Sequence, residues 1–295
     1  MNFIGIGGQV VPADKAVVSV MDHGFMYGLG LFETFRTYNG VPSLLLRHLD
    51  RLTAGCESLG ICYQPNIDEL MNHISELLAA SNLTEAYIRY TLTAGEGDLG
   101  LPVGDYESPQ EIIYVKPLPE TPALLYTEGR PLRLLHTRRN TPEGAVRLKS
   151  LHYMNNILAK RELTASSQPG AGPAEGLLLT ADGYLSEGIV SNLFFVRDGV
   201  LYTPSVQTGI LPGITRSCVI EAAAELGLTC EEGFYTWDEL LQANEIFTTN
   251  SIQELVPVNA LYDTDNRRKM VGAGKCGDLT AGLLQAYRKK ARNLA

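Results

Sequence analysis

Residues 147–160 of the 295-residue chain read RLKSLHYMNNILAK. Lys149 stands here directly before a region, from about Leu151 to Leu163, that we predict to be an amphipathic helix. A lysine that is partly withdrawn from water can attack a carbonyl group and form a Schiff base. A solvated surface lysine fits the same pattern, so the chemical interpretation needs support from other parts of the chain.

Two stretches on the C-terminal side of this lysine place polar groups at the ends of predicted elements. Residues 176–204 contain two Asp-Gly pairs, which are typical of tight hairpin turns, and Glu187 follows the first turn on a predicted strand. Residues 211–216 read LPGITR and precede a predicted helix over 214–226, whose first backbone N–H groups are available to an anion. Taken singly, each feature also fits an ordinary strand or helix start.

The N-terminal part of the chain combines helical and strand patterns. Apolar residues recur at steps of three and four over 45–59 and over 67–80, which predicts two helices. Residues 86–92 alternate apolar and polar, which predicts a strand with Arg89 on the face opposite its buried residues. Another strand is expected over 111–115. The chain is therefore predicted to be a mixed α/β (α+β) protein.

A proline-rich segment marks the predicted domain boundary. Three prolines fall within residues 116–122, KPLPETP, where neither helix nor central strand tolerates them. We expect a smaller N-terminal α/β domain over 1–115, a linker over 116–123, and a larger C-terminal domain over 124–295 that carries Lys149. The chain length agrees with two domains.

Composition argues against several classes of protein. With Lys+Arg 24 and Asp+Glu 33, the formal net charge is -9, which disfavours a broad nucleic-acid or membrane-binding surface. The N-terminus has no signal-peptide pattern and no apolar run reaches about 18 residues, so we expect a cytoplasmic protein. The glycine-rich stretches lack the third glycine of the dinucleotide fingerprint, and there is no Walker lysine. The five cysteines and five histidines show no metal-ligand spacing, so no metal is expected.

Several motifs, taken in their order along the chain, resemble those of the fold type IV family of pyridoxal-phosphate enzymes, also called class IV aminotransferases. The resemblance covers nearly the whole chain. Besides Lys149, the matching motifs are MDHGFMYGLGLFE at 21–33, HLDRL at 48–52, YLSEG at 184–188, LPGITR at 211–216 and TNSIQELVPV at 249–258. This resemblance implies a two-domain fold in which each domain is a sheet packed with helices. It also implies pyridoxal 5′-phosphate as cofactor and a homodimer, with the site between the domains and near the partner subunit.

The family pattern assigns roles to residues at matching positions. Lys149 would bind the cofactor covalently and then move a proton at the substrate carbon, and Glu187 would face the pyridine nitrogen. The remaining cofactor contacts would come from charged or hydrogen-bonding groups. They are Arg51, the backbone amides of Ile214 and Thr215, Asn250 and Ser251.

Two positions distinguish the reactions found in the family. Thr34 occupies a position where the branched-chain aminotransferases typically have glycine, and Thr34 and Asn250 both resemble the aminodeoxychorismate lyases. The resemblance therefore implies elimination of pyruvate from aminodeoxychorismate to give 4-aminobenzoate for folate biosynthesis, with Thr34 helping to deliver a proton to the departing group. Glu33 and the triplet 87–89 also resemble the branched-chain pattern, so a branched-chain or D-amino-acid aminotransferase is the alternative.

The substrate of such a lyase carries two carboxylates, which need cationic or hydrogen-bonding partners. The candidates are Arg89, Arg138, Arg139 and Asn250, with Tyr27 lining the pocket. For each arginine, a surface charge or a structural ion pair is an equally good interpretation at this point.

Overall fold

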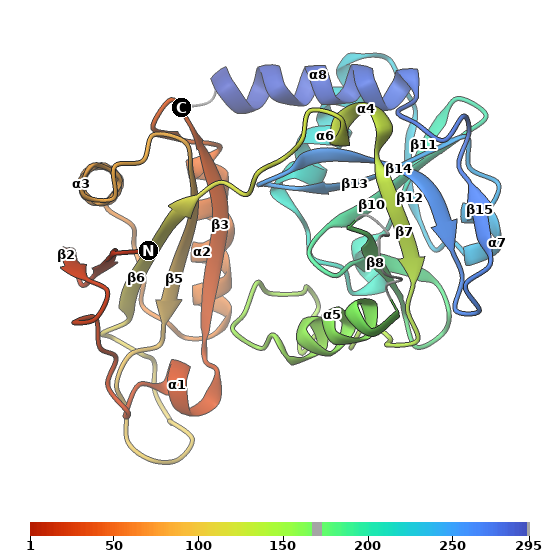
Figure 1. Cartoon of the computed structure of the whole chain (residues 1–295). Coiled ribbons are helices and arrows are strands. Elements are labelled where there is room, and N and C mark those ends of the chain that lie inside the picture. Colours follow the sequence, from red (N-terminus) through yellow and green to blue (C-terminus); the bar gives the residue numbers. More distant parts are fainter. Residues whose placement is uncertain (167–172, 294–295) are drawn as a thin grey trace. The chain divides into compact units, whose positions relative to one another are not determined.

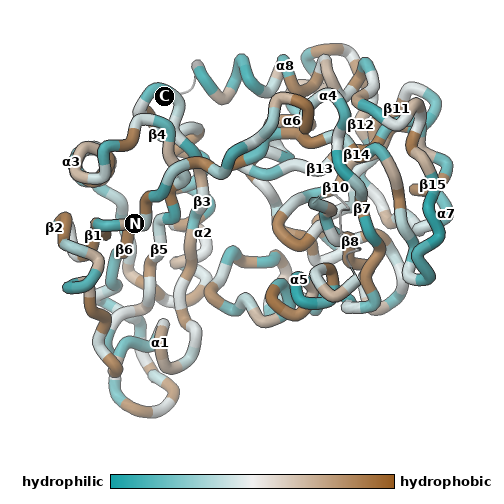
Figure 2. The backbone as a smooth tube through the Cα atoms, in the orientation of Figure 1, coloured by the Kyte–Doolittle hydropathy of each residue, from teal (hydrophilic) through white to brown (hydrophobic). Residues whose placement is uncertain are grey.

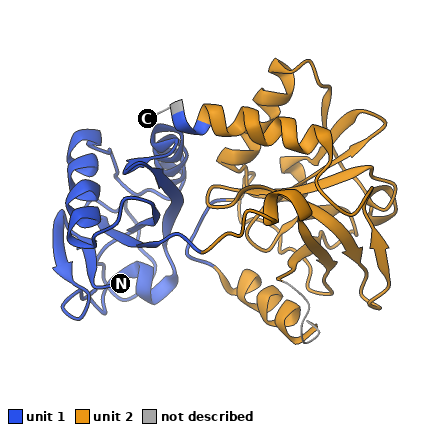
Figure 3. Cartoon of the chain, turned by 45° about the horizontal axis from the view of Figure 1, so that its top comes forward, with its two compact units in different colours: residues 1–119, 148–152, 291–295 blue, residues 120–147, 153–290 orange. Residues whose placement is uncertain are grey.

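The computed structural model describes residues 1–166 and 173–293, which form two compact units (Figures 1 and 3). Unit 1 contains Met1–Pro119, Leu148–His152 and the chain from Ala291 on. Unit 2 contains Glu120–Arg147 and Tyr153–Lys290. The fold is a mixed α/β fold with one sheet in each unit.

Unit 1 is built on a six-stranded sheet in which neighbouring strands are antiparallel. The strand order is β2 (Gln9–Pro12), β1 (Phe3–Ile6), β6 (Gln110–Pro117), β5 (Ala86–Thr93), β3 (Gly30–Tyr38) and β4 (Val41–Pro42). The helices are α1 (His23–Tyr27), α2 (Leu45–Ser58) and α3 (Ile67–Ala80).

Helices α2 and α3 cover one face of this sheet. Their apolar residues, such as Leu52 and Ile74, pack against Phe35 of β3 and Ile88 of β5 in a continuous core. The helix predicted over 67–80 is confirmed with the same bounds. Because side chains alternate along a strand, Phe32 and its neighbours two residues along β3 lie on the opposite face.

Residues 148–152 belong to unit 1 and not, as expected, to the larger C-terminal unit. The backbone explains the difference, because this segment lies along β3 as an additional extended partner. Phe32 N donates to Lys149 O at 2.9 Å, and Leu151 N donates to Gly30 O at 3.1 Å. The following helix α5 (Met154–Ser166) therefore begins three residues later than predicted.

Unit 2 is built on a nine-stranded mixed sheet within the described residues. The strand order is β12 (Cys230–Gly233), β11 (Val200–Pro204), β10 (Asn192–Arg197), β13 (Glu245–Asn250), β14 (Glu254–Tyr262), β7 (Arg130–Leu134), β8 (Glu175–Leu179) and β9 (Leu185–Gly188), with β15 (Arg268–Met270) also paired to β14. The helices are α4 (Leu125–Glu128), α5, the 3₁₀ turn η1 (Val206–Thr208), α6 (Ile214–Glu225), α7 (Trp237–Leu240) and α8 (Asp278–Asn293).

The core of unit 2 comes from the apolar side chains of its sheet, including Leu193, Phe195 and Ile246. The predicted hairpin between β10 and β11 is confirmed, since Asp198 and Gly199 both have the positive φ that such a turn requires. Helix α8 is mostly hydrophilic along its tube in Figure 2. Its buried residues, such as Leu283 and Tyr287, lie on its inner side. Among the described helices, none is long and apolar enough to cross a membrane.

Candidate active site

Lys149 lies over an aromatic ring of unit 1 that it shares with Arg89. Its Nζ is 4.6 Å from the centroid of the Phe32 ring, and the Arg89 guanidinium carbon is 3.6 Å from the same centroid. Phe32 is buried, so both cations are attracted to a ring largely shielded from water. Arg89 Nε also donates to Thr91 Oγ1 at 3.2 Å, which fixes the guanidinium on this face of the sheet.

Thr34 lies on the same sheet face as Phe32. It is two residues farther along β3 and pairs directly with Arg89 of β5. The structure therefore brings together three residues predicted from the sequence, Lys149, Thr34 and Arg89, on one face of unit 1. This face offers two cations and a hydroxyl.

Arg51 of α2 reaches the opposite face of β3, where it meets a buried carboxylate. Its Nε donates to Glu33 Oε1 at 2.8 Å and its Nη2 donates to Glu33 Oε2 at 2.6 Å. His48 Nδ1 lies 2.6 Å from the same Oε2. Burial by itself raises the pKa of Glu33, but Arg51 and His48 outweigh it and hold that pKa at about 2. Sequence reasoning had assigned no role to Glu33 or His48.

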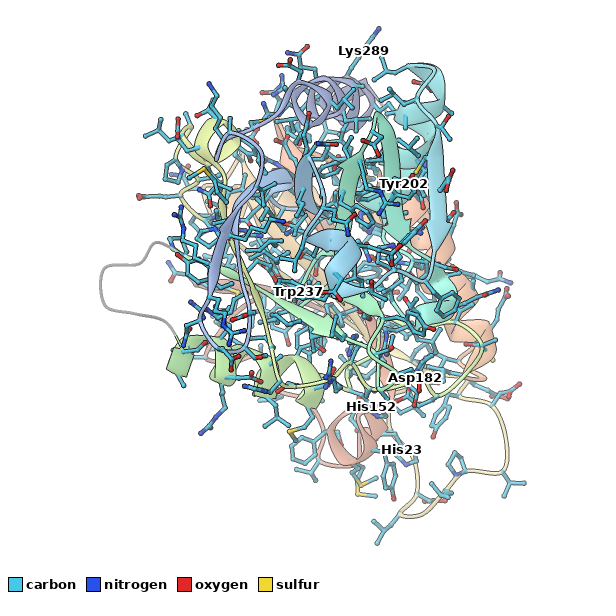
Figure 4. All side chains as sticks on the ribbon, turned by 90° about the vertical axis from the view of Figure 1, so that its right-hand side faces the viewer. His23, His152, Asp182, Tyr202, Trp237 and Lys289 are labelled. Atoms are coloured by element: carbon cyan, nitrogen blue, oxygen red, sulfur yellow. The ribbon has the colours of Figure 1, made fainter. Side chains whose placement is uncertain are left out.

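Tyr27 ends α1 and is partly exposed. Its hydroxyl accepts a hydrogen bond from Gly100 N at 2.9 Å, and its backbone carbonyl is 3.1 Å from His152 Nε2. His23 of α1 and His152, both labelled in Figure 4, each contact Tyr27, His23 through its ring and His152 through its Nε2. Tyr27 thus holds a loop of unit 1 and the end of the segment that carries Lys149.

Glu187 of β9 is buried in unit 2 and accepts several hydrogen bonds. Its Oε1 accepts from Arg139 Nε at 2.8 Å, and its Oε2 accepts from Leu211 N at 2.9 Å and from Asn192 Nδ2 at 3.3 Å. Arg147 Nε lies 3.9 Å from Oε1. Burial, and then the charge of Arg139, lower the pKa of Arg147 to about 10, against an opposing effect of Glu187.

Arg139 and Arg138 differ in surroundings although they are adjacent. Arg139 forms an ion pair with Glu187 through its Nε. Its Nη1 donates to Asn140 Oδ1 and Asn155 Oδ1, both at 2.8 Å. Arg139 therefore belongs to a structural ion pair, one of the two interpretations that the sequence left open. Arg138 is exposed, so its assignment to a substrate carboxylate stays a prediction.

The N-terminus of α6 is connected to Glu187 through Asn192. Gly213 is the N-cap residue, and no side chain among the described residues caps the first backbone N–H groups of the helix. Asn192 Nδ2 donates to Leu211 O at 2.9 Å as well as to Glu187. The predicted anion donors Ile214 and Thr215 therefore follow a segment that is hydrogen-bonded to Glu187. Asn192 lies outside the YLSEG motif at 184–188, and the sequence did not reveal its role in linking Glu187 to α6.

The turn after β13 holds the last two predicted residues. Asn250 Oδ1 accepts from the backbone N–H groups of Ile252 at 3.0 Å and Gln253 at 2.8 Å, so it shapes the turn that presents Ser251. The preceding Thr249 is buried, and its Oγ1 has no hydrogen-bond partner among the described residues. Ser191 Oγ, next to Asn192, is also buried without a hydrogen-bond partner among the described residues. A buried hydroxyl without a partner is costly, so a polar ligand is a natural partner for this region.

The family model for amino-transferase class IV matches residues 30–261. The chain therefore belongs to the class IV aminotransferase family. It is 38% identical to the aminodeoxychorismate lyase of Bacillus subtilis over 99% of this chain and 95% of that protein. It is 30% identical to the branched-chain-amino-acid aminotransferase of Escherichia coli K12 over 97% of this chain and 92% of that protein.

Solved structures of both kinds of enzyme are similar to the fold. The branched-chain amino acid aminotransferase of Escherichia coli superposes with a TM-score of 0.84 at 30% identity, covering 100% of this chain and 96% of that chain. The 4-amino-4-deoxychorismate lyase of Pseudomonas aeruginosa has a TM-score of 0.82 at 31% identity, covering 98% and 99%. Another branched-chain amino acid aminotransferase was solved with pyridoxamine 5′-phosphate; its TM-score is 0.83 at 28% identity, covering 100% and 95%. The expected family and fold are confirmed.

Proposed function

We propose that this protein is a 4-amino-4-deoxychorismate lyase, which releases pyruvate from aminodeoxychorismate and leaves 4-aminobenzoate. The observation that carries the proposal is the position of Thr34, whose hydroxyl-bearing side chain lies on the same sheet face as Phe32 and Lys149 and pairs with Arg89. Similarity to the Bacillus subtilis lyase, at 38% identity, supports the same reaction.

The cofactor of this enzyme is pyridoxal 5′-phosphate, and the residues present fit it. Unit 1 supplies the amine of Lys149 and the guanidinium of Arg51. Unit 2 supplies a buried carboxylate, Glu187, hydrogen-bonded to the segment that leads into the N-terminus of α6. The Thr249 hydroxyl, two residues before Ser251, is buried without a hydrogen-bond partner among the described residues and is a further polar group suited to a phosphate ligand. The bound cofactor would supply an electron sink for charge that develops on the substrate carbon.

Each residue then has a defined task. Lys149 would hold the cofactor through its amine, and the same amine would remove the proton from the carbon that bears the substrate nitrogen. Glu187, held in place by Arg139 and Leu211 N, would face the pyridine nitrogen and favour its protonated form. Arg89 offers two parallel donors to a substrate carboxylate. Thr34 donates a proton toward the departing enolpyruvyl group, a task that glycine cannot perform.

Product analysis tests the proposed reaction directly. Purified protein supplied with pyridoxal phosphate and aminodeoxychorismate should form 4-aminobenzoate and pyruvate in equal amounts. Treatment with borohydride should attach the cofactor covalently to the wild-type chain and not to Lys149→Ala, as measured by mass spectrometry. Absence of both products would refute the lyase assignment.

An aminotransferase of branched-chain or D-amino acids is the second candidate. It is favoured by the TM-score of 0.84 to the Escherichia coli branched-chain enzyme. The same Lys149 and Glu187 would serve that reaction. Rapid amino transfer from D-alanine or a branched-chain amino acid to a keto acid, without 4-aminobenzoate formation, would establish this candidate instead.

The proposal includes a cytoplasmic homodimer that acts in folate biosynthesis. The chain has a mass of 32.2 kDa, so light scattering should give about twice this value for the purified enzyme. A strain that lacks the protein should need added 4-aminobenzoate for growth. Growth without it would argue against the folate assignment.

A further inference from the structure

A buried triad in unit 1 joins β3 to α2. Glu33 lies on the helix-covered face of β3, among apolar residues such as Leu31 and Phe35. An ionised carboxylate at such a position is strongly unfavourable unless it is paired and hydrogen-bonded. His48 and Arg51 both meet this requirement, because residues three apart on a helix share one face.

The contact between Glu33 and Arg51 fixes the orientation of the whole guanidinium group. Both carboxylate oxygens accept from one edge of it, through Nε at 2.8 Å and Nη2 at 2.6 Å. The guanidinium is planar, so holding one edge also sets the direction of Nη1. The Arg51 side chain is 17% exposed whereas Glu33 is 1% exposed, so Arg51 extends outward from the buried carboxylate.

His48 adds a second constraint on the carboxylate. It is buried, and burial lowers its pKa, as do the charges of Arg51 and Lys149, against the opposing effect of Glu33. The imidazole is therefore neutral at pH 7, and its Nδ1–H donates to Glu33 Oε2, since a carboxylate can only accept. A neutral histidine leaves Arg51 as the cation that balances Glu33.

We propose that Glu33 and His48 are positioning residues for Arg51: Glu33 clamps the guanidinium edge, His48 clamps Glu33, and Arg51 presents a fixed donor to the phosphate group of the cofactor. The inference rests on the proposed function only in taking Arg51 as a phosphate ligand. The preference of the protein for phosphorylated over unphosphorylated pyridoxal then depends on Glu33, which contacts Arg51, and on His48, which contacts Glu33.

The test compares two ligands that differ only in the phosphate. Apoenzyme is titrated with pyridoxal 5′-phosphate and with pyridoxal, and the ratio of the two Kd values is measured for each variant by visible absorbance. Glu33→Gln removes the charge but keeps the shape. We expect it to weaken pyridoxal phosphate binding about 10- to 100-fold, the effect of losing a charge-assisted pair, and to change pyridoxal binding by less than about threefold.

Two further variants keep the test decisive if Glu33→Gln does not fold. His48→Phe removes the donor to Glu33 and should lower the preference for pyridoxal phosphate over pyridoxal, as Glu33→Gln does. His48→Asn keeps a donor and should retain most of the wild-type preference. Equal loss of affinity for both ligands, or no change in the ratio, would overturn the positioning role.

Arg51→Lys separates this inference from the proposed function. If wild-type protein prefers pyridoxal phosphate and Arg51→Lys loses that preference while Glu33→Gln and His48→Phe keep it, only the positioning role fails. If wild-type protein shows no preference for the phosphate, the assignment of Arg51 to the phosphate fails, and the positioning role fails with it.

Discussion

Arg139 Nε donates to Glu187 Oε1 at 2.8 Å, and both side chains are more than nine-tenths buried. Removing one partner of a buried ion pair leaves the other charge uncompensated, which typically costs about 3–5 kcal/mol. We expect Arg139→Gln to lower the free energy of unfolding by about 2–4 kcal/mol, because Arg147 at 3.9 Å still offsets part of the Glu187 charge. Urea unfolding of the apoenzyme measures the effect.

The neighbouring residue provides a matched control for this prediction. Arg138 carries the same side chain and is exposed, so Arg138→Gln should change the free energy of unfolding by less than about 0.5 kcal/mol. If the two substitutions lower the free energy of unfolding equally, the ion pair between Arg139 and Glu187 does not stabilise the fold.

The low pKa of Glu33 predicts a loss of stability in acid. The carboxyl has a pKa of about 2 in the folded protein and an ordinary value of 4.5. Because the folded value lies below the ordinary one, the ionised carboxylate stabilises the fold above pH 4.5, and this contribution disappears as the pH falls from 4.5 towards 2. The difference corresponds to roughly 3 kcal/mol.

Comparison with Glu33→Gln isolates this effect from the titration of other groups. The wild-type advantage in the free energy of unfolding should be full at neutral pH and should shrink steadily below about pH 4.5. A gap between the two proteins that stays constant through the acid range would show that Glu33 does not titrate with a depressed pKa.

Local patterns were sufficient to predict the elements of the fold. The helical spacing over 67–80 and the alternation over 86–92 correspond to α3 and β5, because the apolar residues of each segment lie on one face and pack into the same core. The start of α5 could not be predicted in this way. Residues 148–152 are held by hydrogen bonds to β3, more than a hundred residues away in the chain, and no local periodicity contains that contact.

The candidate site shows the same limit at the level of side chains. Motif order assigned Lys149, Thr34 and Glu187 to positions in the family pattern, but two adjacent arginines could not be told apart from their sequence. Only the structure shows that Arg139 is buried against Glu187. Likewise, Glu33 lies between the apolar inward-facing residues Leu31 and Phe35 of β3, and its partners on α2 become visible only when strand and helix are packed together.

Replacement of Thr34 separates elimination from cofactor binding. In Thr34→Gly the hydroxyl is lost while Lys149, Arg51 and Glu187 are unchanged. We expect 4-aminobenzoate formation to fall about 100-fold or more, the usual contribution of a proton donor, with the Kd for pyridoxal phosphate changed by less than about threefold. Thr34→Ser keeps the hydroxyl and should retain most of the activity. Unaltered turnover in Thr34→Gly would remove Thr34 from the mechanism.

Gly213 is required for the close approach of α6 to Asn192. A Cβ at this position would clash with Asn192 Oδ1, and Asn192 cannot move freely because its Nδ2 donates to both Leu211 O and Glu187 Oε2. Gly213→Ala should therefore lower the free energy of unfolding by about 1–3 kcal/mol and weaken cofactor binding, since displacement of Asn192 removes a hydrogen bond from Glu187. Thermal unfolding and cofactor titration measure the two effects.

The same substitution elsewhere in unit 2 gives the opposite expectation. Gly282 lies inside α8, and a Cβ there would meet no atom of the described residues within 4 Å apart from its chain neighbours and the backbone of its own helix. Alanine is the better helix former by about 1 kcal/mol, so Gly282→Ala should raise the free energy of unfolding by about 0.5–1 kcal/mol and leave cofactor affinity unchanged. If both alanine variants shifted stability in the same direction, the close approach at Gly213 would not be the cause. A loss of cofactor affinity confined to Gly213→Ala would instead tie the start of α6 to Glu187 through the Asn192 side chain.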